Sequence, residues 1–193
     1  AFEYCDIDLL NLMKKYSMNI REAKYVIFEL LLAASYLHGN NYLHRDIKPE
    51  NIFINSCGEI KLGDLGLSVE RTENMTPTVV TRWYRSPEIL LQSKNYDHKV
   101  DVWSLGCLFV ELITGSTCSY WSEPHQCVKH KYSRHFFNLF CKNKNASCVN
   151  IPRPLFPGKN DESQLDLIYV VLGDKSKLPV GDEDRHRMFP YFE

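Results

Sequence analysis

The stretch from Lys99 to Thr114 limits the fold of this chain more than any other feature of its sequence. Apolar residues recur along it without leaving a polar face, namely Val100, Val102, Trp103, Leu105, Leu108, Val110, Leu112 and Ile113. A helix of this kind is expected to be buried on every side. The rest of the 193 residues must therefore surround it, and an apolar content of 44% is enough for one such core.

A second helix is predicted from Ile20 to His38, where apolar residues recur at a spacing of three or four. Asn19 is suited to cap its start, and Gly39 is suited to end it. A weaker helical pattern runs from about Ser163 to Leu172, behind a capping Asn160–Asp161 pair.

Two short apolar runs, Asn51–Ile54 and Ile60–Leu62, flank the turn sequence Ser56-Cys57-Gly58-Glu59, and this pattern predicts a β-hairpin. The stretch from Gly63 to Pro87 is polar and long for a loop, which is typical of functional segments. The expected fold is therefore mainly α-helical with one small β-ribbon.

Charge and composition exclude several classes of function. With 23 basic and 24 acidic residues the net charge is −1, which argues against a nucleic-acid partner. No apolar run reaches the roughly 18 residues of a membrane helix, so no membrane partner is expected, and no secretory signal is recognised. We expect an intracellular protein, in the cytoplasm or the nucleus, with reduced cysteines.

The segment from Ser116 to Arg153 has no apolar period, and it is rich in histidine and cysteine: Cys118, Cys127, Cys141 and Cys148. A zinc site is one interpretation, although no C-x-x-C pair is present. The alternatives are a disordered surface insertion, which we expect, or non-coding sequence carried into the chain. Asn145-Ala146-Ser147 is interpreted as a chance match to the glycosylation pattern.

The run His44-Arg45-Asp46-Ile47-Lys48-Pro49-Glu50-Asn51 combines the side chains that phosphoryl transfer needs. It matches H-R-D-x-x-x-x-N, the catalytic loop of eukaryotic protein kinases, and the chain therefore resembles that family. The resemblance implies that Asp46 accepts the proton of a substrate hydroxyl and that Asn51 binds Mg²⁺. Lys48 would contact the transferring phosphate as charge develops on it.

Asp64-Leu65-Gly66 follows the predicted hairpin and resembles the metal-binding D-F-G of the same family, with Leu65 in place of phenylalanine. Asp64 would bridge the phosphates of ATP through Mg²⁺. Leu65 is expected to pack into the core. Asp46, Asn51 and Asp64 are therefore expected to converge around magnesium.

Thr81-Arg82-Trp83-Tyr84-Arg85-Ser86-Pro87-Glu88 resembles the end of a kinase activation segment, in the form found in the cyclin-dependent, MAP and cyclin-dependent-kinase-like kinases. In that group the arginine matching Arg85 constrains the backbone at the position of Val80, which favours proline after the phosphorylated Ser or Thr. Thr81 is assigned to the catalytic residues. Glu88 and Asp101 are interpreted as structural, with Asp101 bracing the catalytic loop.

The resemblance extends to both ends of the chain. Phe2 would be the gatekeeper of the adenine pocket, the backbones of Glu3 and Cys5 would bond adenine, and Phe53 would form the floor. Stretches at 156–159, 164–165 and 172–173 resemble the segment specific to this kinase group, nearest the cyclin-dependent-kinase-like members. The expected division is a hinge over 1–9, the lobe core with both loops over 10–115, the insertion over 116–153 and the group-specific segment over 154–193.

No glycine-rich loop and no lysine of the V-A-I-K type occurs in the sequence. We therefore expect the carboxy-terminal lobe of a kinase, α+β overall, truncated at both ends and inactive in isolation, because ATP must be positioned from both sides. Two alternatives are a pseudokinase that acts as a scaffold and a truncated product without a stable fold. Retention of Asp46, Asn51 and Asp64 favours an enzyme, a protein Ser/Thr kinase that uses ATP and Mg²⁺.

Thr76 occupies the position that is phosphorylated in related kinases, and Arg45 is available to bind the phosphate. The second arginine that the family places after the metal aspartate is Val69 here, with Arg71 as a substitute. Thr76 is predicted to be a regulatory phosphosite, and the alternative is an ordinary loop threonine. The expected partners are a protein substrate and, for activation, a cyclin-like protein or an upstream kinase.

Overall fold

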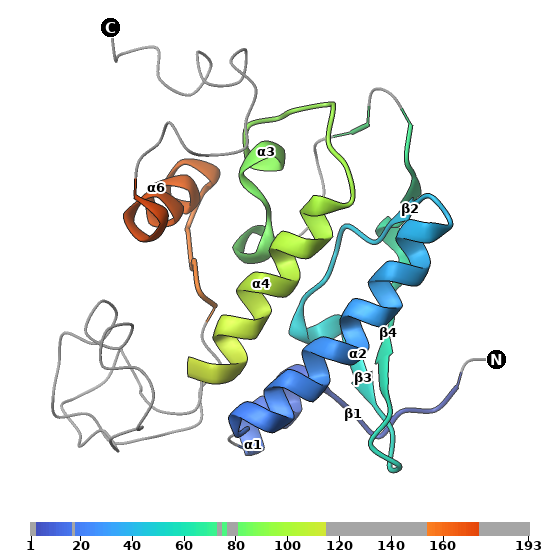
Figure 1. Ribbon diagram of the computed structural model, residues 1–193. Helices are drawn as coiled ribbons and strands as arrows, with labels where there is room; N and C mark the ends of the chain where they lie inside the picture. Colours follow the sequence, from blue (N-terminus) through green and yellow to red (C-terminus); the bar gives the residue numbers. More distant parts are fainter. Residues whose placement is uncertain (1–2, 17, 73–74, 77–80, 115–153, 174–193) are drawn as a thin grey trace, which may run out of the picture.

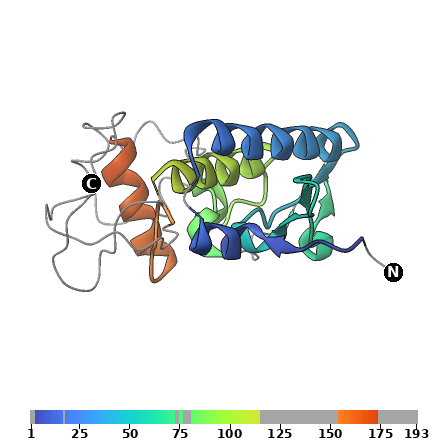
Figure 2. The same cartoon turned by 90° about the horizontal axis from the view of Figure 1, so that it is seen from below.

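Two long helices form the centre of the protein. The computed structural model describes residues 3–16, 18–72, 75–76, 81–114 and 154–173. Helices α2 (Ile20–Gly39) and α4 (Lys99–Thr114) lie side by side in both views of the ribbon (Figures 1 and 2). Their facing sides share one core, in which Leu30 and Leu108 are fully buried. The sequence predicted both helices, and α2 is one residue longer than expected.

Capping side chains explain where two of the three predicted helices, α2 and α6, begin. The Asn19 side chain accepts hydrogen bonds from the backbone N–H groups of Arg21 and Glu22, and Glu22 bonds back to the Asn19 N–H, which together form a capping box. The same arrangement, with Asn160 and Ser163, starts α6 (Asp161–Leu172). These caps satisfy backbone donors that a helix leaves unpaired at its first turn.

Two small antiparallel sheets replace the single ribbon that the sequence predicted. Strands β3 (Ile52–Ile54) and β4 (Ile60–Leu62) form the expected hairpin, and β1 (Ile7–Asp8) pairs with β3 on its other edge. A second sheet joins β2 (Tyr42–Leu43) to β5 (Val69–Glu70). Helix α1 (Leu9–Lys15), which Asp8 caps, was not predicted.

A second core forms where α6 meets the short helix α3 (Pro87–Leu90) and the 3₁₀ turn Arg82–Tyr84. Its members come from distant parts of the chain, and they include Tyr84, Cys107, Phe156 and Ile168. Figure 1 shows α6 to one side of α4, with α3 beside both. The described part of the predicted group-specific segment, 154–173, is therefore packed against the end of the activation segment.

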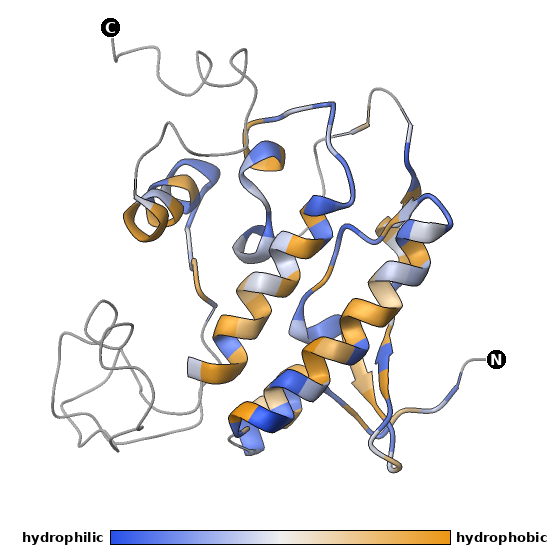
Figure 3. Cartoon of the chain, in the orientation of Figure 1, coloured by the Kyte–Doolittle hydropathy of each residue, from blue (hydrophilic) through white to orange (hydrophobic). Residues whose placement is uncertain are grey.

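The expectation that α4 is buried on every side was wrong. Val102 and Ile113 remain 47% and 41% exposed, and Figure 3 shows apolar residues along the whole helix. Among the described residues, α2 covers one side of α4 and the turn Arg82–Tyr84 covers another, so part of the apolar circumference has no neighbour. The interpretations of the segment from Ser116 to Arg153 lie outside the described residues. None of the described helices is long and apolar enough to cross a bilayer.

Candidate active site

A buried carboxylate from α4 sets the shape of the catalytic loop. Asp101 is fully buried, and its two oxygens accept hydrogen bonds from the backbone N–H groups of His44 and Arg45, each at 2.9 Å. The Nε2 atom of His38 lies 2.8 Å from the same carboxylate. Arg45 has a φ of 65°, a left-handed conformation that costs a residue with a side chain about 1 kcal/mol or more. The bonds to Asp101 compensate for that strain, in keeping with the bracing role assigned to this residue.

Three of the predicted catalytic residues are in direct contact. One carboxylate oxygen of Asp46, Oδ2, accepts hydrogen bonds from Lys48 Nζ and from Asn51 Nδ2, both at 2.8 Å. Asn51 Nδ2 also donates to the Asp46 carbonyl at 2.9 Å. Asp46 is 3% exposed, and its other oxygen, Oδ1, is buried without a hydrogen-bond partner among the described residues. The loop therefore contains one buried acceptor, Asp46 Oδ1, that no described residue satisfies.

Backbone contacts bring the D-L-G turn to this loop. The Gly63 N–H donates to the Asn51 carbonyl at 2.9 Å, and the Gly63 carbonyl lies 2.9 Å from Nε2 of His44. Asp64 follows directly, with a φ of 56°, and its side chain accepts from the Gly66 N–H at 3.2 Å. No hydrogen bond joins the Asp64 side chain to Asp46 or Asn51. Within the described part of the chain, no cluster of three His, Cys, Asp or Glu side chains is arranged to hold a metal.

The prediction that Leu65 packs into the core was wrong. Leu65 is 54% exposed and belongs to a short 3₁₀ turn, Leu65–Leu67, none of whose residues is buried. Asp64 caps this turn through its own side chain, so that the D-L-G residues are held by local bonds and not by burial.

The residues assigned to the adenine side lie around the three-stranded sheet. Glu3 is exposed and lies 3.4 Å from Lys61 Nζ, whereas Cys5 is half-buried. Phe53, on β3, packs so closely over Gly63 that a Cβ atom at Gly63 would lie 2.6 Å from the ring. The proposed adenine floor and the backbone that leads to Asp64 are therefore in contact. Phe2, the assigned gatekeeper, lies outside the described residues.

At the end of the activation segment the structure ties Arg85 to α6. Arg85 Nη1 lies 3.2 Å and 3.4 Å from the two carboxylate oxygens of Asp161, and Arg82 Nε bonds to the same carboxylate at 2.8 Å. Thr81 starts the turn Arg82–Tyr84, and no hydrogen bond joins its side chain to a described residue of the catalytic loop. Val80 lies outside the described residues, so the assignment of Val80 and Arg85 to the pocket for the substrate residue after the phosphorylated one, the +1 pocket, stays a prediction.

The predicted phosphosite lies next to one of its two proposed arginines. The backbone carbonyl of Thr76 is 3.5 Å from Arg45 Nη1, and the Thr76 residue itself is exposed. Arg45 Nε also donates to the Leu67 carbonyl at 2.8 Å. Arg71 is exposed, and among the described residues only its backbone groups are bonded, to Asn41. The geometry therefore favours Arg45 over Arg71 as the partner of Thr76.

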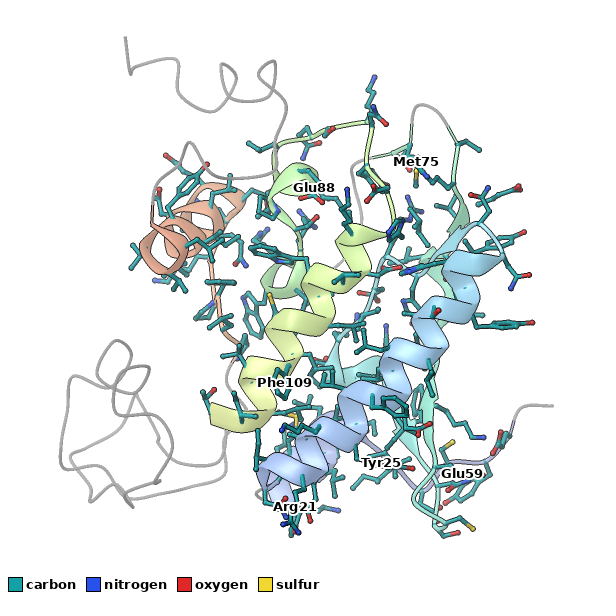
Figure 4. The ribbon with its side chains drawn as sticks, viewed as in Figure 1. Arg21, Tyr25, Glu59, Met75, Glu88 and Phe109 are labelled. Carbon is teal, nitrogen blue, oxygen red and sulfur yellow. The ribbon has the colours of Figure 1, made fainter. Side chains whose placement is uncertain are left out.

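Sequence reasoning missed a buried acid beneath the activation segment. Glu111 is 1% exposed within α4, and its Oε2 accepts a 2.6 Å hydrogen bond from the Tyr84 hydroxyl. Burial raises the pKa of Glu111 to about 7, and the negative charge of Glu50 acts in the same direction. Burial likewise raises the pKa of Glu88, one of the labelled side chains in Figure 4. The sequence signal that could have identified Glu111 is an acid that directly follows the apolar run Leu108, Phe109 and Val110 in α4.

Comparisons with known proteins identify the family of this chain. The family model for the protein kinase domain matches residues 1–176. Mitogen-activated protein kinase 5 of Arabidopsis thaliana is 35% identical over 176 residues, which are 90% of this chain and 37% of that protein. Cyclin-dependent kinase-like 1 of Caenorhabditis elegans is 42% identical over 119 residues, which are 60% of this chain and 34% of that protein. This chain thus spans little more than a third of the length of these two relatives.

The fold is shared with a solved structure of the same kind. A crystal structure of the yeast RNA Pol II CTD kinase CTDK-1 complex superimposes with a TM-score of 0.65 at 33% identity, covering 87% of this chain and 44% of that one. The chain belongs to the protein kinase family. Within it, these relatives identify the group of cyclin-dependent, MAP and cyclin-dependent-kinase-like kinases.

Proposed function

We propose that this protein transfers the γ-phosphoryl group of ATP to Ser or Thr residues of protein substrates. The observation that carries the proposal is Asp46 Oδ1, a buried carboxylate oxygen without a partner among the described residues. A buried acceptor left unsatisfied costs about 1–3 kcal/mol, and a substrate hydroxyl that donates to it removes that cost. The same contact aligns the attacking oxygen and accepts its proton, which is the role of the base in phosphoryl transfer.

The residues around Asp46 suit ATP and Mg²⁺. Asn51 donates through Nδ2 to Asp46, so its amide oxygen is left to act as a ligand. Asp64 adds an exposed carboxylate one residue beyond a glycine that is bonded to Asn51. Magnesium prefers oxygen ligands of these two kinds and usually shares them with substrate phosphates. Bound there, magnesium would neutralise charge on the phosphates. Lys48 is paired with Asp46 and therefore lies beside the proposed base.

The finer parts of the proposal concern specificity and partners. We infer a preference for proline after the phosphorylated residue, since Arg85, one of the two residues assigned to the +1 pocket, is fixed by Asp161. An upstream kinase acting on Thr76, or a cyclin-like activator, remains the proposed regulator. An intracellular location, cytoplasmic or nuclear, rests on the free thiols of Cys5, Cys57 and Cys107.

The test compares Asp46→Asn with the unchanged full-length protein in a phosphoryl-transfer assay on peptides with and without proline after the acceptor. We expect Asp46→Asn to lose at least ~10²-fold in rate, because the buried base is gone while the shape of the site is kept. Asp166→Asn, a change at an exposed position on α6, serves as the control and should leave the rate unchanged. Equal rates for Asp46→Asn and the unchanged protein would rule out the role given to Asp46. Nucleotide binding without transfer in the unchanged protein would favour the scaffold alternative.

A further inference from the structure

One residue of the activation segment is anchored in a small apolar core. Met75 is 4% exposed, and its N–H donates to the Lys94 carbonyl at 2.9 Å. It packs in a cluster with Leu43, Ile89, Tyr96 and Val100, against which Val69 also lies. Figure 4 shows Met75 on the activation segment, away from Phe109 at the far end of α4. The segment is thus docked by an apolar side chain one residue before the predicted phosphosite.

A tyrosine hydroxyl in the same cluster links that segment to the catalytic loop. Tyr96 is 6% exposed, and its hydroxyl accepts a hydrogen bond from Arg45 Nη1 at 2.9 Å and donates to the Thr76 carbonyl at 2.8 Å. In this chain of bonds the charged guanidinium polarises the hydroxyl and strengthens its bond to the carbonyl. Tyr96 therefore joins three stretches that are distant in sequence.

The same contacts leave two groups available to a phosphate. The Thr76 residue is exposed although its carbonyl is fixed, so its hydroxyl is open to modification. Arg45 uses Nε and Nη1 for the bonds described, and its Nη2 donates to none of the described residues. A phosphate on Thr76 would thus meet an arginine that is already oriented, which reduces the ordering cost of the new ion pair.

We propose that Tyr96 is a positioning residue that docks the activation segment on Arg45 before Thr76 carries a phosphate. The hydroxyl of Tyr96 is the part that acts, since its ring only fills the apolar cluster. The consequence is that the unphosphorylated protein already holds this segment near its working position, and phosphorylation strengthens an existing arrangement. The proposal deepens the kinase function given above and rests on it only for its effect on rate.

The test removes the hydroxyl and keeps the ring. Hydrogen exchange of the full-length, unphosphorylated protein is followed by mass spectrometry in peptides that contain Met75 and Thr76. Tyr96→Phe should speed exchange there about tenfold, as expected for the loss of one or two buried hydrogen bonds. Tyr36→Phe, at a tyrosine that is 75% exposed, is the matched control and should leave exchange unchanged. Equal exchange in the two variants would overturn the proposal.

A second variant changes Arg45, at the other end of the hydrogen bonds that run through Tyr96 to Thr76. Arg45→Lys keeps the positive charge and removes the fork that reaches both Leu67 and Tyr96, so it should speed exchange in the same peptides by a similar factor. If Arg45→Lys leaves exchange unchanged, the link does not dock the segment and the proposal is wrong. Thermal unfolding shows whether either variant has lost stability. If one has, hydrogen exchange in the other variant decides whether the link docks the segment.

The effect on rate is read in a Thr76→Ala background, where no phosphate is present. Adding Tyr96→Phe should lower kcat by about tenfold and leave KM for ATP unchanged, because the tyrosine acts on the segment and not on the nucleotide. A rise in KM with kcat unchanged would contradict the positioning role. If the unchanged protein shows no transfer either, the proposed function fails, while the exchange experiment still tests the docking.

Discussion

The catalytic loop and the activation segment differ in how they are held. The loop from His44 to Asn51 is largely buried, and Asp101 fixes two consecutive backbone N–H groups at its start. The described residues of the activation segment, from Asp64 to Glu88, touch the rest of the protein at separate points, among them the pairing of β5 with β2, Met75 with Tyr96, and Tyr84 with Glu111. Within the described part of the chain, the catalytic loop is therefore held by buried bonds, whereas the activation segment is attached only at intervals.

This difference indicates which part of the proposed site can change its arrangement. A loop fixed by buried polar bonds has one arrangement, because breaking any bond leaves an unsatisfied group in the interior. A segment attached at intervals can release one contact and keep the others. We therefore expect changes at Asp101 to affect the protein as a whole, and changes in the activation segment to have smaller, local effects.

The largest effect is expected for Asp101→Ala. The change leaves two buried N–H groups and the strained backbone of Arg45 without their acceptor, so the free energy of unfolding should fall by about 3–5 kcal/mol. Chemical denaturation measures the loss. Asp166→Ala, at an exposed position, should change the free energy of unfolding by no more than about 0.5 kcal/mol. A loss below about 1 kcal/mol for Asp101→Ala would break the comparison.

The second effect concerns pH at the Tyr84 contact. Folding raises the pKa of Glu111 from its ordinary value of 4.5 to about 7, so the folded protein binds the proton more tightly. The contribution of this proton to the free energy of unfolding is therefore complete below pH 4.5 and is lost as pH rises through about 7. The loss amounts to about 3 kcal/mol in all. Denaturation midpoints between pH 5 and 8 measure this slope. Glu111→Gln, which keeps an amide in contact with Tyr84, should show a flatter profile, and an unchanged slope would contradict the assignment.

The junction between the two regions is tested at Gly63. A Cβ atom there would lie 2.6 Å from the Phe53 ring, so Gly63→Ala forces the ring to shift and should cost about 1–3 kcal/mol in unfolding free energy. Gly106→Ala is the control, since nothing lies within 4 Å of a Cβ atom at that exposed position in α4. There the substitution should stabilise the protein by about 0.5–1 kcal/mol. Thermal unfolding distinguishes the opposite signs.

The smallest effect is expected in the D-L-G turn. Because Leu65 is 54% exposed, Leu65→Ala should change the unfolding free energy by no more than about 0.5 kcal/mol. The same truncation at the fully buried Leu108 should cost about 2–5 kcal/mol. A large loss for Leu65→Ala would show that this side chain is buried in the protein after all, and the contrast between the two regions would weaken.

The sequence predicted the elements whose own residues show an apolar period, a capping side chain or a turn sequence. Helices α2, α4 and α6 and the β3–β4 hairpin follow from apolar spacing, from Asn19 and Asn160, and from the turn around Gly58. Strands of two residues, such as β1, β2 and β5, are too short to show an alternation, and they exist only because a partner strand lies beside them. Helix α1 was missed for a similar reason, since seven residues give barely two turns.

The site was predictable to a similar degree. The contact of Asp46 with Lys48 and Asn51 is local, so a motif eight residues long was enough to place it. The exposure of Leu65 and of Val102 was predicted wrongly, because burial depends on which elements cover a residue and not on its own type. Tyr96 and Glu111 were overlooked, since their partners are tens of residues away in the chain.

The brace between Asp101 and the catalytic loop has a consequence for how the protein is made. The groups it joins are 56 and 57 positions apart, so the loop closes only after α4 has been synthesised and has found α2. Long-range contacts of this sort form late, because the entropy of closing the intervening chain must first be overcome. We therefore expect a growing polypeptide that has only reached Asn51 to lack the bonded arrangement of the catalytic loop, which forms when α4 docks.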